Sequence, residues 1–82
     1  MQASIEISLY PFDKNYIDII KAFIKKINLN KKVTIETNYM STQIFGDYDE
    51  IISLLKNEMK EVFEKHKAVF VMKIVGSNLK QN

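Results

Sequence analysis

Cysteine and arginine are both absent from this sequence of 82 residues, and each absence narrows the functions to consider. Without cysteine there is no disulfide framework, which is typical of proteins in the reducing cytoplasm. Arginine recognises phosphate and guanine through paired hydrogen bonds, and here twelve lysines against ten acidic residues leave a net charge of only +2. We therefore expect a cytoplasmic protein with no nucleic-acid partner.

Glycine and histidine are scarce, which limits the chemistry that the side chains could perform. The two glycines, Gly46 and Gly76, are too few for a loop that cradles phosphate. The single histidine, His66, follows a predicted helix among lysines, where a cation favours the helix dipole. It has no partners for a catalytic triad and no metal-ligand cluster. We expect no catalytic residue, no bound metal and no cofactor, so the protein is not predicted to be an enzyme.

No long hydrophobic run is present, so membrane insertion is not expected. A transmembrane helix needs about 20 apolar residues, and the N-terminus lacks the basic segment of a secretory signal. The hydrophobic content of 46% nevertheless supplies ample material for a core. We expect one domain over residues 1–82, with residues 76–82 as a polar tail.

Apolar residues at helical spacing predict two amphipathic helices. The first covers about residues 15–27, after an expected N-cap at Asp13. The second begins at Asp47, which forms a pattern like a capping box with Glu50, and runs to about Lys65.

Four segments have the patterns of β-strands. Apolar and polar residues alternate in residues 3–10, 32–38 and 40–45, and residues 68–75 are almost entirely apolar. Pro11 should end the first, because it cannot donate to a ladder. Gly46-Asp47 should close the third, and Gly76 should end the fourth. The order is β-α-β-β-α-β. Right-handed crossovers then predict an α+β, ferredoxin-like fold with an antiparallel sheet in the order 4-1-3-2 and both helices on one face.

Alternation assigns the central-strand side chains to two faces of this sheet. Under the helices we expect Ile5, Ile7, Leu9, Met40, Thr42 and Ile44. The open face then carries Glu6, Ser8, Ser41 and Gln43, with Tyr10, Phe45, Phe70 and Met72 on or near it. Polar residues alone could be merely solvated. Large apolar groups beside them indicate contact with a partner or ligand instead.

Three segments together resemble a known family. They are Ile-Ser-Leu-Tyr-Pro-Phe at 7–12 with Tyr-Ile-Asp-Ile-Ile at 16–20, Met-Ser-Thr at 40–42, and Gly-Asp-Tyr-Asp at 46–49. The chain resembles, over nearly its whole length, the YkoF-like thiamine-binding family, a relative of the small MTH-type thiamine-binding domains. The resemblance implies a ferredoxin-like domain that assembles into homodimers or homotetramers. It also implies non-catalytic binding of thiamine or its hydroxymethylpyrimidine moiety, in vitamin uptake or salvage.

A site for thiamine needs hydrogen-bond partners for an aminopyrimidine, an apolar or aromatic wall, and preferably negative charge for the thiazolium cation. Glu6 is the candidate carboxylate, and Thr42 replaces Ser41 if the pocket opens toward the helices. The candidate ligand-binding residues are Glu6, Ser8, Tyr10, Met40, Ser41, Thr42, Gln43 and Phe45. The alternative is a small oligomeric structural or regulatory module of the same fold, with no small-molecule ligand.

Overall fold

The long strand β1 (Gln2–Pro11) lies at the centre of the sheet in the computed structural model, which describes residues 1–81. It pairs antiparallel with β3 (Thr42–Asp47) on one side and with β4 (Ala68–Val75) on the other. The short strand β2 (Thr34–Thr37) pairs with β3, so the order is β2-β3-β1-β4. The predicted ferredoxin-like topology is confirmed.

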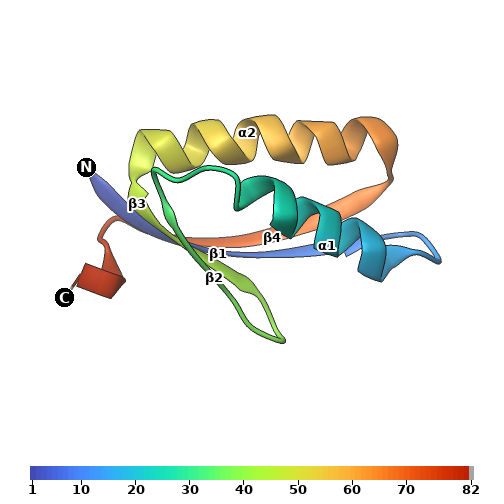
Figure 1. The fold of residues 1–82 in the computed structure, drawn as a ribbon, viewed down its shortest axis with the longest axis horizontal. Coiled ribbons are helices and arrows are strands. Elements are labelled where there is room, and N and C mark those ends of the chain that lie inside the picture. Colours follow the sequence, from blue (N-terminus) through green and yellow to red (C-terminus); the bar gives the residue numbers. More distant parts are fainter. Residues whose placement is uncertain (82) are drawn as a thin grey trace.

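Both helices, α1 (Tyr16–Ile27) and α2 (Tyr48–Lys65), cover the same face of the sheet (Figure 1). The core lies between the two layers, and its fully buried large side chains come from every layer: Ile5, Ile27, Ile44, Ile51 and Leu55. The predicted inward residues of β1 are buried, as is Thr42. No helix among residues 1–81 has the length and apolar character needed to cross a bilayer.

The predicted N-cap is confirmed for α2 but not for α1. The Asp47 carboxylate accepts the Glu50 backbone N–H at 3.1 Å, as the capping pattern predicted. For α1 the predicted cap at Asp13 is wrong, because the N-cap is Asn15. Asp13 instead accepts the backbone N–H of Asn15 at 2.7 Å and shapes the turn before the helix.

The third strand begins later than predicted, and Met40 does not belong to it. Its side chain is 85% exposed, so its predicted place under the helices is wrong. The cause is Asn38, whose side-chain oxygen accepts the backbone N–H groups of Met40 at 2.8 Å and Ser41 at 3.0 Å. This local turn removes those donors from a strand ladder. The neighbouring strand β2 is correspondingly shorter than residues 32–38.

Gly46 lies in β3, which ends at Asp47, where the Gly46-Asp47 pair was predicted to close it. Its φ of 151° is a conformation that side chains other than glycine rarely adopt. A Cβ there would also lie 3.4 Å from the Val33 side chain. This glycine therefore lets β3 turn directly into α2.

The placements of two large apolar side chains also differ from the prediction for the open face. Phe70 pairs in register with Leu9 and packs against Phe23 at 5.2 Å, so it lies under the helices. Met72, opposite Ile7, faces the same way. Phe45 does lie on the open face but is only 8% exposed.

The C-terminal segment covers part of the open face, on the side of the sheet away from the helices (Figure 1). Ser4 donates its hydroxyl to the Ser77 carbonyl at 2.7 Å and accepts the Leu79 N–H at 2.9 Å. A short 3-10 turn, η1 (Leu79–Gln81), follows, and the Lys80 ammonium lies 5.9 Å from the centre of the Phe45 ring. Residues 76–81 of the predicted polar tail thus cover one end of the sheet, and Asn82 lies outside the described residues.

Candidate ligand-binding site

The central strand β1 extends further than its neighbour β3, and this leaves a gap in the sheet. Pairing between β1 and β3 ends at Ile7 opposite Thr42, whereas pairing with β4 continues to Pro11 opposite Ala68. From Ser8 onward, β1 therefore has a strand on one side only. On the other side the chain makes the turn at residues 38–41.

The backbone of Leu9 faces this gap. Tyr48 donates its N–H to the Met1 carbonyl at 2.8 Å on the β3 side of β1, while Phe12 donates its N–H to the Lys67 carbonyl at 2.9 Å on the β4 side. Because successive residues of an antiparallel strand direct their polar groups to opposite sides, the odd-numbered residues of β1 point toward β3. Leu9 is the odd-numbered residue that lies beyond the end of β3.

No described residue pairs with the Leu9 backbone on that side. In a continued ladder its partner would be Met40, but the Met40 N–H goes to Asn38. Leu9 as a whole is only 7% exposed. Because the described residues offer no partner for them, the N–H and C=O of Leu9 are available to a ligand.

The gap opens into a cavity of about 400 Å³ between β1, α1 and the 38–41 turn. This volume is within the usual range for small-molecule sites, about 300–1,000 Å³. The floor is apolar, with Ile7, Leu9, Ile20, Phe23 and Ile24. The side walls are formed by polar residues: Ser8, Thr37, Asn38, Ser41 and Thr42. The mouth of the cavity is formed by Tyr10, Pro11, Phe12, Tyr16, Tyr39 and Met40.

The described lining of this cavity carries no charged side chain. Its polar groups are hydroxyls and an amide, some of them already held in place. The Thr37 and Thr42 hydroxyls lie 3.1 Å apart, and Ser8 donates to the Met40 carbonyl at 3.4 Å. Such a lining suits a flat, neutral ring that forms directional hydrogen bonds.

Exposed aromatic rings surround the mouth of the cavity. Tyr10, Phe12, Tyr16 and Tyr39 are each at least half exposed, although they are large and mostly apolar. Aromatic groups gathered at one end of a small domain typically mark a contact site. Their faces also attract cations.

The structure divides the eight predicted ligand-binding residues between two places. Ser8, Tyr10, Met40, Ser41 and Thr42 line the cavity. Glu6, Gln43 and Phe45 line a separate hollow of about 420 Å³ on the open face.

The carboxylates of the open-face hollow already have partners. Glu6 accepts the Ser41 hydroxyl at 3.0 Å and lies 3.7 Å from the Lys73 ammonium. Glu36 forms an ion pair with Lys80. A cationic ligand would have to displace a lysine from either of them.

Sequence reasoning missed several elements of the cavity. Phe12 and Tyr16 lie in the segments that carried the family resemblance, so that signal could have identified them. Asn38 was predicted to end the second strand, but it lies with Tyr39 in a turn. The Leu9 peptide has no signal in the sequence, because it becomes free only where β3 ends.

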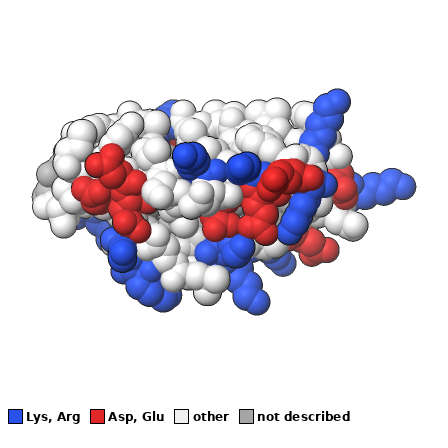
Figure 2. All heavy atoms as spheres, turned by 90° about the horizontal axis from the view of Figure 1, so that it is seen from above, with Lys and Arg blue, Asp and Glu red and all other residues white. Residues whose placement is uncertain are grey.

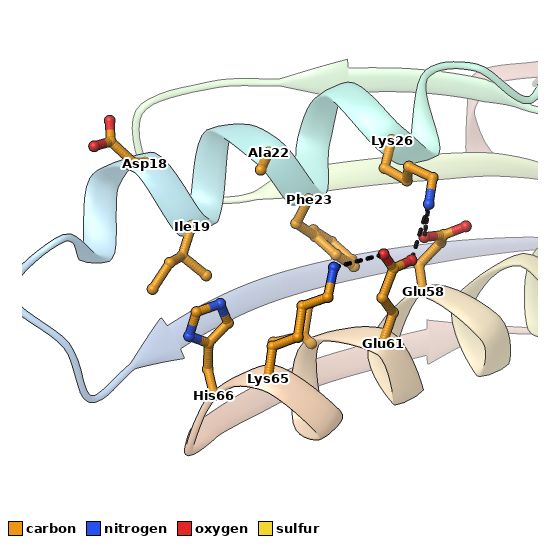
Figure 3. Close-up of a pocket in the computed structure, with 10 residues that line it drawn as sticks. Asp18, Ile19, Ala22, Phe23, Lys26, Glu58, Glu61, Lys65 and His66 are labelled. Carbon is orange, nitrogen blue, oxygen red and sulfur yellow. Dashed lines mark hydrogen bonds and ion pairs between the residues drawn. The ribbon is translucent and has the colours of Figure 1, made fainter.

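A second groove, of about 290 Å³, lies between the two helices (Figure 3). Lys26 of α1 reaches across to α2 and contacts Glu61 at 2.9 Å and Glu58 at 3.6 Å, while Lys65 contacts Glu61 at 3.1 Å. Side chains of both signs are interspersed over the helical face (Figure 2). These contacts join the helices across the groove and involve all the lysines and glutamates that line it.

The ion pairs of this groove predict a dependence of stability on pH. The hydrogen bond from Lys26, followed by that from Lys65, lowers the pKa of Glu61 from 4.5 to about 2. A lowered pKa stabilises the fold above the unfolded value, and this contribution is lost as the pH falls from about 4.5 to 2. We expect Glu61→Gln to be less stable than the parent at pH 7 and equally stable below pH 2. Urea denaturation across this range measures the difference, and a constant difference at all pH values would contradict the assignment.

Comparison with known proteins shows the family. The model of the YKOF-related family matches residues 2–77. The chain belongs to the YKOF-related family. Among curated proteins, none matches the chain.

Solved structures share the fold over nearly the whole chain. Protein SP2199 from Streptococcus pneumoniae superposes with a TM-score of 0.86 at 22% identity, covering 98% of this chain and 91% of its own. TM0486 from Thermotoga maritima, a "putative thiamine biosynthesis/salvage protein", gives a TM-score of 0.83 at 18% identity and coverage of 94% and 85%. The hypothetical protein MJ1052 from Methanocaldococcus jannascii gives a TM-score of 0.80 at 26% identity, and the match covers 99% of this chain and 86% of its own.

Proposed function

We propose that this chain binds thiamine or its hydroxymethylpyrimidine moiety in the cavity beside Leu9, without altering the ligand chemically. The role would be in uptake or salvage of the vitamin. The single observation that carries the proposal is the Leu9 peptide, which faces a cavity with an uncharged lining and has no partner there among residues 1–81. The family and the thiamine-related name of TM0486 support the choice of ligand.

The aminopyrimidine ring matches the hydrogen-bonding groups of a peptide edge. Its amino group is a donor, and the adjacent ring nitrogen is an acceptor. The Leu9 carbonyl and N–H offer the complementary pair on one side of β1. The ring would take the place that β3 leaves empty, above the apolar floor, with Thr42 and Ser41 in the lining of the same cavity.

The thiazolium cation would lie at the mouth, where Tyr10, Phe12, Tyr16 and Tyr39 present aromatic faces. Attraction of a cation to such rings contributes about 0.5–2 kcal/mol, depending on exposure. A carboxylate is therefore not required in this site. The pyrimidine moiety alone should bind by the same peptide contacts, but more weakly than thiamine.

The assembly and location of the protein are further parts of this proposal. A domain of this length buries only about 60–65% of the surface of its unfolded chain, so self-association into a homodimer or homotetramer would supplement its core. The cytoplasmic location expected from the sequence stays a prediction. The absence of catalytic activity also stays a prediction.

Replacing single peptide bonds by esters tests the role of the Leu9 N–H. An ester at Leu9, introduced by chemical synthesis, removes a donor that the fold does not use. We expect thiamine affinity to fall about tenfold, the loss of roughly one hydrogen bond, while the melting temperature changes little. Isothermal titration and thermal denaturation measure the two effects.

The matched control is an ester at Ile7, whose N–H lies in the ladder opposite Thr42. It should lower the melting temperature, because a sheet hydrogen bond is lost. Thiamine affinity that is unchanged by the Leu9 ester would refute the proposed contact.

A further inference from the structure

The turn at residues 38–41 lies beside the free end of β1. The Ser8 hydroxyl donates to the Met40 carbonyl at 3.4 Å, so the backbone of the turn is already next to β1. Continued by two residues, the register of β1 and β3 would bring Met40 opposite Leu9. A β3 lengthened in this way would pair with the Leu9 N–H and C=O and would occupy the gap in the sheet. The chain itself therefore contains a segment that competes with a ligand for this peptide.

The Asn38 side chain prevents this pairing. Its Oδ1 atom accepts the backbone N–H groups of Met40 at 2.8 Å and Ser41 at 3.0 Å. In the longer strand, the Met40 N–H would instead be donated to the Leu9 carbonyl. A single N–H cannot point fully at both acceptors, so the turn at Asn38 and the longer β3 exclude each other.

Packing contributes little to the shape of the turn. Tyr39 and Met40 form its centre, and they are 107% and 85% exposed. The turn is held by hydrogen bonds instead, and three of them involve Asn38. Its Oδ1 atom accepts two, and its backbone N–H donates the third to the Ser41 carbonyl at 3.0 Å. The conformation of the turn therefore depends mainly on this one residue.

We propose that Asn38 is the positioning residue of the site: its side chain keeps β3 from extending over Leu9 and so leaves the Leu9 peptide free for the ligand. This rests on the proposed function for the identity of the ligand and adds the group that keeps its site open. Thiamine and the two-residue extension of β3 compete for the same N–H and C=O. The measured affinity then scales with the fraction of molecules in which the turn is intact.

Amide hydrogen exchange in the ligand-free protein tests this role without any ligand. Asn38→Val removes the acceptor, and valine also favours a strand. The Leu9 amide should then exchange at least about tenfold more slowly than in the parent, because it becomes part of the β1–β3 ladder. Asn38→Ala also lacks the acceptor but does not favour a strand, and it should change the exchange rate in the same direction.

Isothermal titration with thiamine supplies the second measurement. If fewer than about one molecule in ten keeps the site open, the affinity of Asn38→Val should fall at least about tenfold. Asn38→Asp is the conservative variant, because its carboxylate can accept the same two N–H groups. Its Leu9 amide should exchange as in the parent, and thiamine should bind at least as tightly.

The matched control is Asn30→Val. The Asn30 side-chain oxygen accepts the Lys32 N–H at 2.8 Å, so this asparagine also shapes a turn, but it lines a separate hollow beside α2. Its replacement should change neither the exchange of the Leu9 amide nor the affinity for thiamine.

The two measurements separate the role of Asn38 from the choice of ligand. A Leu9 amide that exchanges equally fast in the parent, Asn38→Val and Asn38→Ala overturns the role of Asn38, whether or not thiamine binds. Weaker binding without slower exchange overturns it as well, because Asn38 would then act on the ligand directly. Slower exchange in the variants of a parent that does not bind thiamine overturns the proposed ligand and supports the control of the Leu9 peptide by Asn38.

Discussion

An Ile20→Trp variant is expected to bind thiamine at least a hundredfold more weakly than the parent while remaining folded. Ile20 extends from α1 into the floor of the cavity and is only partly buried, so a larger side chain has room at this position. The indole would occupy much of the cavity of about 400 Å³ and would cover the Leu9 peptide. A hundredfold loss corresponds to about 2.7 kcal/mol of binding free energy. Isothermal titration measures the change.

The matched control for this variant is Ala22→Trp. Ala22 lies on the same helix but lines the groove between α1 and α2. The tryptophan at this position is equally large but does not enter the cavity, so the thiamine affinity of the variant should equal that of the parent. Equal affinities for the two tryptophan variants would contradict the location of the site.

Ile44→Ala is expected to produce the largest loss of folding stability, about 3 kcal/mol, within the range of about 2–5 kcal/mol seen for truncation of buried isoleucine. Ile44 is fully buried and pairs with Ile5 of β1 and Ile35 of β2, so it joins three strands beneath the helices. Domains of this length have a total stability of roughly 4–12 kcal/mol, so the variant should unfold at a much lower urea concentration.

The control for this truncation is Ile17→Ala on α1, where the isoleucine side chain is 51% exposed. The free energy of unfolding of this variant should fall by less than about 1 kcal/mol, because the truncation removes little buried surface. Denaturation by urea compares the two variants. A loss for Ile44→Ala no greater than that for Ile17→Ala would contradict the assigned core.

The fold was largely predictable because its signals are local and strong. The helical spacing from Tyr16 to Ile27, the capping pattern at Asp47 and the alternation of β1 each define an element. The chirality of crossovers then leaves few ways to arrange the strands. Thr42 was also placed correctly on the helix side, because alternation from Ile44 is enough to assign it.

The errors have physical reasons that a pattern of residues does not contain. In β4 both faces are apolar, so alternation could not show that Phe70 faces the helices. Met40 left the strand because the Asn38 side chain competes for its backbone N–H. Phe45 lies on the open face but is only 8% exposed, and the Lys80 ammonium of the C-terminal segment, distant in sequence, lies 5.9 Å from the centre of its ring. The central element of the site, the Leu9 peptide, depends on the different lengths of β1 and β3.

A two-dimensional ¹H–¹⁵N NMR titration with thiamine tests the central claim most directly, because it reports binding and location together. We expect the largest shifts at the Leu9 amide and in the 38–42 segment, with the same shifts in a Glu6→Gln variant. An unchanged spectrum of the folded protein at millimolar thiamine would contradict ligand binding. Shifts concentrated at Glu6, Gln43 and Phe45 would instead place the site on the open face.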